Sequence, residues 1–266
     1  MILRYGDESA EVYYLQERLN KRGYLPAFKR SVFDDAVLAA IKEFQKDSGL
    51  VVDGVYGPKT HSALMGSDTN HLLSQSDLEQ AADSLEVDLA SVEAVRKVES
   101  RGAGFLSGGK PIILFERHIM RRRLAINGYS DDDIEMLSAK YENIVSKSMG
   151  GYRGGSGEYV RLNKALKIDE DSALESCSWG MFQIMGFHWS LLGYKSAADF
   201  VARMSESEGN QLMAFVAFIK ADAGLHNALK NRDWPEFARR YNGPAYKKNR
   251  YDDRLADAYA AAMEVS

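Results

Sequence analysis

The stretch Val92–Phe105, VEAVRKVESRGAGF, decides how the rest of this chain is interpreted. Ser91 is the expected N-cap of a helix that begins here. Val92, Val95 and Glu99 then fall at i, i+3 and i+7 and lie on one stripe of the 3.6-residue period. We expect this stripe to face the protein interior, which places a carboxylate on an apolar surface.

Glu99 has the properties expected of a general acid. Desolvating an ionised Glu costs several kcal/mol unless the group is paired or stays protonated. The C-terminal end of a helix also disfavours negative charge, so both effects raise the pKa of Glu99. Gly102 and Gly104 end the helix and leave the carboxyl uncrowded, as a site for a polymer requires. The alternative is a Glu that is simply solvated at a helix end.

The composition indicates a globular protein of one large or two modest domains. The chain has 266 residues, 45% of them hydrophobic, which is enough for a sizeable core. Its net charge of −4 argues against nucleic acid as a partner. The single cysteine, Cys177, excludes an intramolecular disulfide and fits synthesis in a reducing compartment.

Several classes of protein lack support in the sequence. The N-terminus has no apolar segment typical of a signal peptide, and no uncharged run is long enough to span a membrane, so we expect no membrane insertion. The five histidines lack the spacing of a helical ligand pair, and neither a phosphate-binding loop nor a nucleophile elbow is present. We therefore expect no metal and no cofactor.

Residues 1–66 predict a compact unit of three helices. EVYYLQERLNKRGYL and AVLAAIKEFQKDSGL are each a short helix ended by Gly, and VVDGVYGPKTHSAL is a turn followed by a last helix. The segment resembles the peptidoglycan-binding domain type 1 family. The matching residues are Leu15, Gln16, Leu19, Gly23, Tyr24, Phe44, Gln45, Gly49, Leu50, Asp53, Gly54, Gly57, Pro58 and Thr60.

The turn DGVYGPKT is the part of this unit that we expect to bind the cell wall. Most of the motif is structural, because its glycines set turns and its leucines form a core. Backbone N–H groups and two side chains of the turn remain to hold a sugar or a stem peptide. The predicted wall-binding residues are Asp53, Gly54, Tyr56, Gly57 and Thr60. A polar linker over 67–76 then leads to a second domain over 77–266.

Glu116 is the candidate for a second carboxylate in that domain. The run PIILFER, 111–117, predicts a short buried strand, in which Glu116 shares a face with Ile112 and Leu114. The alternative is a structural carboxylate paired with an arginine such as Arg101. Glu158, which follows a glycine-rich loop, is a less favoured substitute.

The run SCSWGMFQIMG, 176–186, is either core or part of a site. It is dense in apolar groups but also holds Ser178 and Gln183, which need partners if buried. Trp179 offers an apolar face and a donor edge suited to stacking on sugar rings. Further on, Tyr241 and Asn242 close a helix before Gly-Pro.

The order Glu99-Ser100, then Ser178 to Gln183, then Tyr241-Asn242 resembles the lysozyme-like superfamily. Residues 77–266 are more closely similar to the N-acetylmuramidase domain of modular phage endolysins, with ESRGAGF, PIILFERH and SWGMFQIMG as the matching runs. The resemblance implies that Glu99 is the catalytic acid and that Gln183, Tyr241 and Asn242 line the sugar cleft. The expected fold is mainly α, with a small three-helix domain before a larger lysozyme-like helical domain with a short β element.

The predicted function is an endolysin that cleaves peptidoglycan between N-acetylmuramic acid and N-acetylglucosamine. Hydrolysis with retention needs a second carboxylate about 5 Å from the acid, and inversion needs one about 6.5–9.5 Å away. A lytic transglycosylase, which needs no second carboxylate, and a non-catalytic wall-binding protein are the alternatives. We expect a monomer, made in the host cytoplasm, that reaches the wall through a pore formed by another protein.

Overall fold

The computed structural model describes residues 1–100 and 102–265, and these form two compact units, Met1–Gln80 and Ala81–Glu264. The division falls inside helix α4 (Gln75–Leu85). The whole of the predicted linker, 67–76, falls within the first unit. The Thr69 hydroxyl donates to Ser48 O at 2.8 Å, and Leu72 packs against the core.

The first unit confirms the predicted group of three helices: α1 (Ala10–Lys21), α2 (Asp35–Asp47) and α3 (Pro58–Leu64). Side chains just before α1 and α2, Ser9 and Asp34, accept hydrogen bonds from backbone N–H groups of the first turn. Pro58 lies in the first turn of α3, where a missing N–H group costs nothing. The inward faces form one apolar core, which includes Leu15, Leu19, Ile41 and Phe44.

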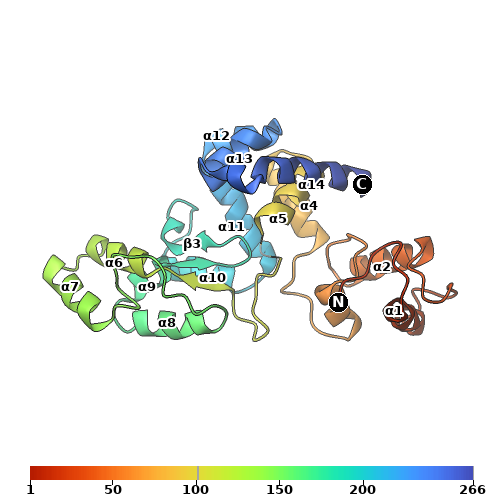
Figure 1. Ribbon diagram of the computed structural model, residues 1–266, viewed down its shortest axis with the longest axis horizontal. Coiled ribbons are helices and arrows are strands. Elements are labelled where there is room, and N and C mark those ends of the chain that lie inside the picture. Colours follow the sequence, from red (N-terminus) through yellow and green to blue (C-terminus); the bar gives the residue numbers. More distant parts are fainter. Residues whose placement is uncertain (101, 266) are drawn as a thin grey trace. The chain divides into compact units, whose positions relative to one another are not determined.

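The second unit is mainly helical and contains a small sheet. Its helices beyond α4 are α5 (Leu89–Glu99), α6 (Arg117–Ile126), α7 (Asp131–Lys140), α8 (Gly157–Ala165), α9 (Glu170–Glu175), α10 (Ala197–Met204), α11 (Glu208–Ala221), α12 (Ala223–Lys230), α13 (Trp234–Asn242) and α14 (Tyr251–Val265), with 3-10 turns at Gly186–His188 and Tyr246–Asn249. Figure 1 shows α8 and α9 beside the sheet, with α6 next to α9 and α7 beyond α6, while α11 leads from the sheet toward α12 and α13. The expected fold class, mainly α with a short β element, is confirmed.

The sheet consists of β1 (Ile113–Phe115), β2 (Cys177–Trp179) and β3 (Ile184–Met185), paired antiparallel in that order. Leu114 lies opposite Ser178, which in turn lies opposite Met185. Neighbouring residues point to opposite faces, so Trp179, opposite Ile113, belongs to the other, buried face. The register thus separates Ser178 from Trp179.

Helix α5 begins earlier than the sequence predicts. Its N-cap is Asp88, whose carboxylate accepts a hydrogen bond from Ser91 N at 2.7 Å. The expectation that Ser91 is the cap is therefore wrong, because Asp88 satisfies the free N–H group and Ser91 is buried one turn inside the helix. Val92 and Val95 are buried, as the stripe containing Glu99 predicts.

Among the described residues, no single helix has the length and apolar composition of a membrane span. Helices α11 and α12 meet that test only as a pair, and the pair is bent by 105°.

Candidate active site

Glu99 is the last residue of α5, and its carboxyl is half-buried against the end of α13. The Asn242 side-chain amide donates to Glu99 Oε2 at 3.0 Å. Glu99 Oε1 is buried and has no hydrogen-bond partner within residues 1–100 and 102–265. Burial raises the pKa of Glu99, although the hydrogen bond from Asn242 and the charge of Arg254 offset part of this effect. A raised pKa favours the protonated carboxyl, which can donate a proton to a leaving oxygen.

Tyr241, next to Asn242, lies in an aromatic cluster. Its ring stacks on Phe237 at 6.0 Å between centroids and meets the rings of Phe215 and Phe218 edge-on at 5.5 and 6.0 Å. Burial raises the pKa of the Tyr241 hydroxyl, and the negative charge of Glu99 raises it further. Tyr241 is therefore a neutral group held rigidly beside Glu99.

Ser178 and Gln183 bind one another. The Ser178 hydroxyl donates to Gln183 Oε1 at 3.0 Å, and Gln183 Nε2 donates to Gly180 O at 2.8 Å and Ile112 O at 3.3 Å. Gln183 also holds a left-handed backbone conformation, with φ +54°. These contacts stabilise the turn between β2 and β3. In the part of the chain that the structure describes, no hydrogen bond joins this pair to Glu99.

The prediction that Trp179 stacks on a sugar does not agree with the structure. Its side chain is 2% exposed, and the indole N–H donates to Leu174 O at 3.1 Å. Both the apolar face and the donor edge are thus used inside the protein, because the register of β2 turns Trp179 toward the core. We therefore assign Trp179 to the core.

Glu116 caps α6 directly after β1. The Tyr152 hydroxyl donates to both carboxylate oxygens at 2.9 Å, and His118 Nδ1 lies 3.2 Å from Glu116 Oε2. Arg101, the partner considered from the sequence, lies outside the described residues. Ile112, Leu114 and Glu116 are half-buried and alternate with buried residues, so the predicted shared face exists, but it is the less buried face of the strand.

Glu158, the less favoured alternative, is a structural carboxylate. It is fully buried in the first turn of α8. Its oxygens accept from Phe115 N, Arg153 N and Gly154 N at 3.1, 2.5 and 3.0 Å and from the Arg161 guanidinium at 2.8 Å. Burial opposes ionisation, but these donors hold the pKa of Glu158 below its ordinary value. The lowered pKa favours the ionised carboxylate, which is a setting opposite to that of a general acid.

Two buried polar residues of α11, Glu208 and Gln211, position the loop after Glu99 and were missed by the sequence analysis. Gly104 N donates to Glu208 Oε1 at 2.8 Å, while Gln211 Nε2 donates to Gly104 O at 3.3 Å. Gln211 Oε1 accepts from Met181 N at 2.8 Å. The available signal was their i, i+3 spacing on a helix whose other inward residues are apolar.

Gly104 and Gly180 are required because Gln211 lies against both. A Cβ at Gly180 would lie 2.6 Å from Gln211 Cδ, and one at Gly104 would collide with Gln211 Oε1. Gly104 of ESRGAGF and Gly180 of SWGMFQIMG therefore pack on the same side chain. This contact connects the segment after Glu99 with the turn that contains Gln183.

The turn DGVYGPKT of the first unit is organised by Gln45. Gln45 Oε1 accepts from Gly54 N at 2.9 Å, and Gln45 Nε2 donates to Asp53 Oδ1 at 2.9 Å and Val55 O at 3.1 Å. The Asp53 carboxylate also accepts from Val55 N at 2.9 Å. Asp53 and Gly54 therefore shape the turn, although the Asp53 side chain stays exposed.

Tyr56 and Thr60 are buried, so their side chains are not available to bind a ligand as predicted. Tyr56 is 5% exposed, and its hydroxyl lies 2.6 Å from His61 Nδ1. The Thr60 hydroxyl donates to Val55 O at 3.1 Å. Their places in the motif are explained by packing inside the first unit. Gly57 is the half-buried N-cap of α3.

Within residues 1–100 and 102–265, no group of three His, Cys, Asp or Glu side chains is arranged to hold a metal ion.

Comparisons with known proteins match one family in each of the two compact units of the chain. Residues 88–263 match the N-acetylmuramidase family, and residues 8–64 match a peptidoglycan binding domain family. The chain is similar to the crystal structure of a Burkholderia AP3 phage endolysin, with 46% identity and a TM-score of 0.87 over 99% of this chain and 100% of that chain. The resemblance stated from the sequence is thereby confirmed.

A shorter similarity connects the chain to another wall enzyme. The N-acetylmuramoyl-L-alanine amidase CwlL of Bacillus licheniformis is 38% identical over 65 residues, which are 24% of this chain. The chain matches only 18% of the length of that amidase.

Proposed function

Because this chain belongs to the N-acetylmuramidase family, we propose that it hydrolyses the β-1,4 bond between N-acetylmuramic acid and N-acetylglucosamine in bacterial peptidoglycan. It is a peptidoglycan hydrolase similar to a phage endolysin. The observation that carries the proposed reaction is the half-buried Glu99, which has one oxygen bound by Asn242 and the other without a partner among the described residues.

In the proposed mechanism, Glu99 protonates the glycosidic oxygen as the bond breaks. Its raised pKa keeps the carboxyl protonated at a pH where an ordinary Glu is ionised. Asn242 binds Oε2, and Oε1, which is buried and has no hydrogen-bond partner among the described residues, would carry the proton. The neutral Tyr241 packs on Phe237 beside the acid.

We also propose that Glu116 is the second carboxylate. It would either stabilise the positively charged sugar of the transition state or activate the attacking water. It lies at the end of β1 on the face that carries Leu114 and Ser178. The Tyr152 hydroxyl orients both of its oxygens. Ser178 and Gln183, which hold the β2–β3 turn on this sheet, would present backbone groups to the glycan.

The chemical nature of the released sugar ends tests the reaction. Mass spectrometry of soluble muropeptides is to be run with the intact protein and with Glu99→Gln. Hydrated, reducing N-acetylmuramic ends that disappear with Glu99→Gln support hydrolysis. Anhydro ends would identify a lytic transglycosylase, and no soluble sugar from either protein would leave only wall binding.

Residues 1–66, within the first unit, are proposed to hold the enzyme on the wall. Linking two weak binding units raises the effective concentration of the catalytic unit on an insoluble polymer. Since Tyr56 and Thr60 are buried, the proposed contact uses the exposed Asp53, the half-buried Gly57 and neighbouring backbone. Sedimentation of the Glu99→Gln protein with purified peptidoglycan measures this binding, and adding Tyr56→Phe is expected to leave it unchanged.

The similarity to a phage endolysin also supports a proposal for where the protein acts. We expect synthesis in the host cytoplasm and access to the wall through a pore formed by a separate protein. Co-expression tests this, because lysis should need both the enzyme and a pore-forming protein. A monomer with no affinity for nucleic acid is expected, and light scattering should give a mass of 29.7 kDa.

A further inference from the structure

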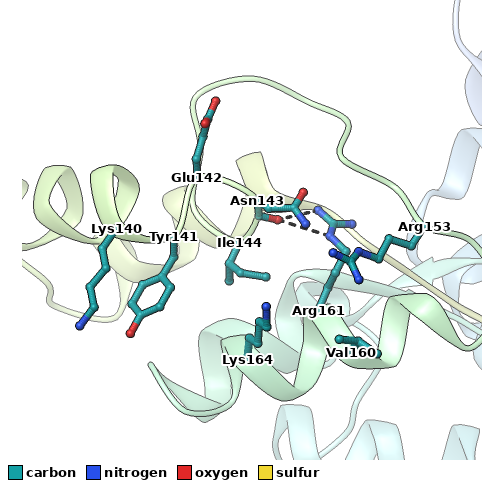
Figure 2. Close-up of a pocket in the computed structure, with 9 residues that line it drawn as sticks. All are labelled: Lys140, Tyr141, Glu142, Asn143, Ile144, Arg153, Val160, Arg161 and Lys164. Atoms are coloured by element: carbon teal, nitrogen blue, oxygen red, sulfur yellow. Dashed lines mark hydrogen bonds between the residues drawn. The ribbon is translucent and has the colours of Figure 1, made fainter.

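A cavity of about 200 Å³ lies in the second unit between residues 140–144 and helix α8. It is lined by backbone and side chains of the segment that follows α7, by Arg153 from the glycine-rich loop, and by Arg161 and Lys164 from α8. Figure 2 shows Lys164 rising from α8 toward this segment, while Arg153 reaches over α8 from the loop. None of these residues takes part in the reaction proposed for Glu99.

The cavity is strongly cationic. Its lining includes Lys140, Arg153, Arg161 and Lys164 but only one carboxylate, Glu142. The Glu142 side chain points away from α8 in Figure 2. Even when the buried partner of Arg161 is counted, an excess of two positive charges remains, in a chain whose net charge is −4. A cavity with low-dielectric walls focuses such charge onto a ligand.

The fold neutralises only one of these four cations with a carboxylate of the described residues. The Arg161 guanidinium pairs with Glu158 at 2.8 Å. Within the described part of the chain, by contrast, no carboxylate oxygen lies within 4.0 Å of the charged side-chain nitrogens of Lys140, Arg153 or Lys164. Like charges that share one cavity repel each other, so this arrangement favours an anion that binds between them.

Arg161 connects the cavity to Glu116. Its guanidinium donates to Phe115 O at 2.7 Å, one residue before Glu116, and lies 5.8 Å from the centre of the Tyr152 ring. The Tyr152 hydroxyl in turn binds the Glu116 carboxylate. A ligand in the cavity would therefore lie behind the group that we propose as the second carboxylate.

We propose that this cavity binds a carboxylate of the peptidoglycan stem peptide during cleavage of the glycan strand. The inference rests on the proposed function, because a muramidase meets a stem peptide wherever its glycan carries one. The sugar rings bring no charge that would need cations, whereas the stem peptide ends and branches in carboxylates. About 200 Å³ is smaller than a typical pocket for a whole ligand but accommodates a carboxylate with a short side chain.

The test compares two substrates and two double variants of the full chain. The substrates are purified peptidoglycan and the same peptidoglycan with the free carboxylates of its stem peptides converted to amides. Removing the stem peptides with an amidase would instead leave a free lactyl carboxylate on each N-acetylmuramic acid. The test variant is Arg153→Gln with Lys164→Gln. The control is Arg122→Gln with Lys167→Gln, which removes the same charge from exposed positions outside the cavity. Thermal unfolding of both variants checks that the fold is retained.

We expect KM of the test variant to rise about tenfold on the unmodified peptidoglycan, since a charge-assisted hydrogen bond is lost, with kcat unchanged. On the amidated peptidoglycan, the test variant should match the unmodified protein. The control should match it on both substrates. An equal loss on both substrates, or no loss on either, would overturn the proposal.

A binding measurement separates failure of this proposal from failure of the proposed function. Calorimetry with the purified stem peptide released by the amidase needs no turnover and is run on the Glu99→Gln protein. The test variant, made in the same background, should bind this peptide about tenfold more weakly. If no substrate is cleaved but this difference in peptide affinity is observed, the proposed reaction is wrong and the proposed carboxylate site is supported. Cleavage without any peptide binding would mean that the reaction is right and the carboxylate site is wrong.

Discussion

Glu99 at the end of α5 and Glu158 at the start of α8 are both carboxylates removed from water, yet their pKa values shift in opposite directions. Glu99 accepts one hydrogen bond, from Asn242, and its Oε1 has no partner among the described residues. Glu158 accepts three backbone N–H groups and the Arg161 guanidinium. The number of donors, rather than burial, separates an acid from a structural anion.

The positions of Glu99 and Glu158 in their helices shift each pKa in the same direction as their surroundings do. Glu99 is the last residue of its helix, where the helix dipole disfavours negative charge. Glu158 is in the first turn of α8, where the dipole favours negative charge. Two carboxylates of one unit thus differ in setting: Glu99 is the proposed proton donor, and Glu158 accepts hydrogen bonds from Arg153 N and Gly154 N of the glycine-rich loop.

The largest expected effect is the loss of activity in Glu99→Gln. Removing a general acid should lower kcat by about 10²- to 10⁴-fold. Release of soluble muropeptides measures this rate, with Glu170→Gln, an exposed carboxylate on α9, as the control. A Glu99→Gln protein that retains full kcat would show that Glu99 resembles Glu158 in being structural.

Glu158→Gln should affect stability instead. Removing the carboxylate leaves Arg161 buried without its ionic partner, which is expected to lower the free energy of unfolding by about 3–5 kcal/mol. Urea unfolding at neutral pH measures the change, and Glu170→Gln should stay within about 0.5 kcal/mol of the unmodified protein. Loss of kcat in a variant of unchanged stability would assign Glu158 to the reaction.

Gln211→Leu extends the comparison to a buried side chain that is fully hydrogen-bonded but carries no charge. The change leaves Met181 N without its acceptor and Gly104 O without its donor. An unsatisfied buried group costs about 1–3 kcal/mol, so the loss of stability should be smaller than for Glu158→Gln. A lower kcat would follow, because Gly104 belongs to the loop after Glu99. Unchanged stability and kcat would contradict a positioning role for Gln211.

The pH dependence of stability should have opposite signs for the two carboxylates. The folded protein holds the Glu99 proton more tightly than the unfolded chain, so stability should fall as pH rises from the ordinary Glu pKa through the raised one. For Glu158, stability should fall as pH decreases through its lowered pKa. Urea unfolding across pH checks both, since Glu99→Gln should remove only the first change and Glu158→Gln only the second.

Much of this arrangement was predictable from local pattern. The spacing of Val92, Val95 and Glu99 placed a carboxyl on a buried stripe, and the structure agrees. The three helices of the first unit and the strand around Leu114 also follow from periodicity and turn residues. Predictions of this kind succeed because they depend on interactions between residues a few positions apart.

Residues whose roles depend on distant partners were predicted less well. Trp179 has a side chain suited to stacking on sugars, but strand pairing turns it into the core. Tyr56 and Thr60 belong to a binding motif, yet their hydroxyls are used inside the first unit. Gln211 lies more than 100 positions from Gly104, so no local pattern could connect them.

The sequence by itself determined that the chain has a wall-binding and a muramidase part, that it is mainly helical, and that Glu99 lies on a buried face. Only the tertiary structure decided that Asn242 binds Glu99, that Glu158 is held ionised by four donors, and that cations gather beside α8. The physical reason is that periodicity records which face of an element is buried. A pKa and a binding cavity depend on groups that folding brings together from distant parts of the chain.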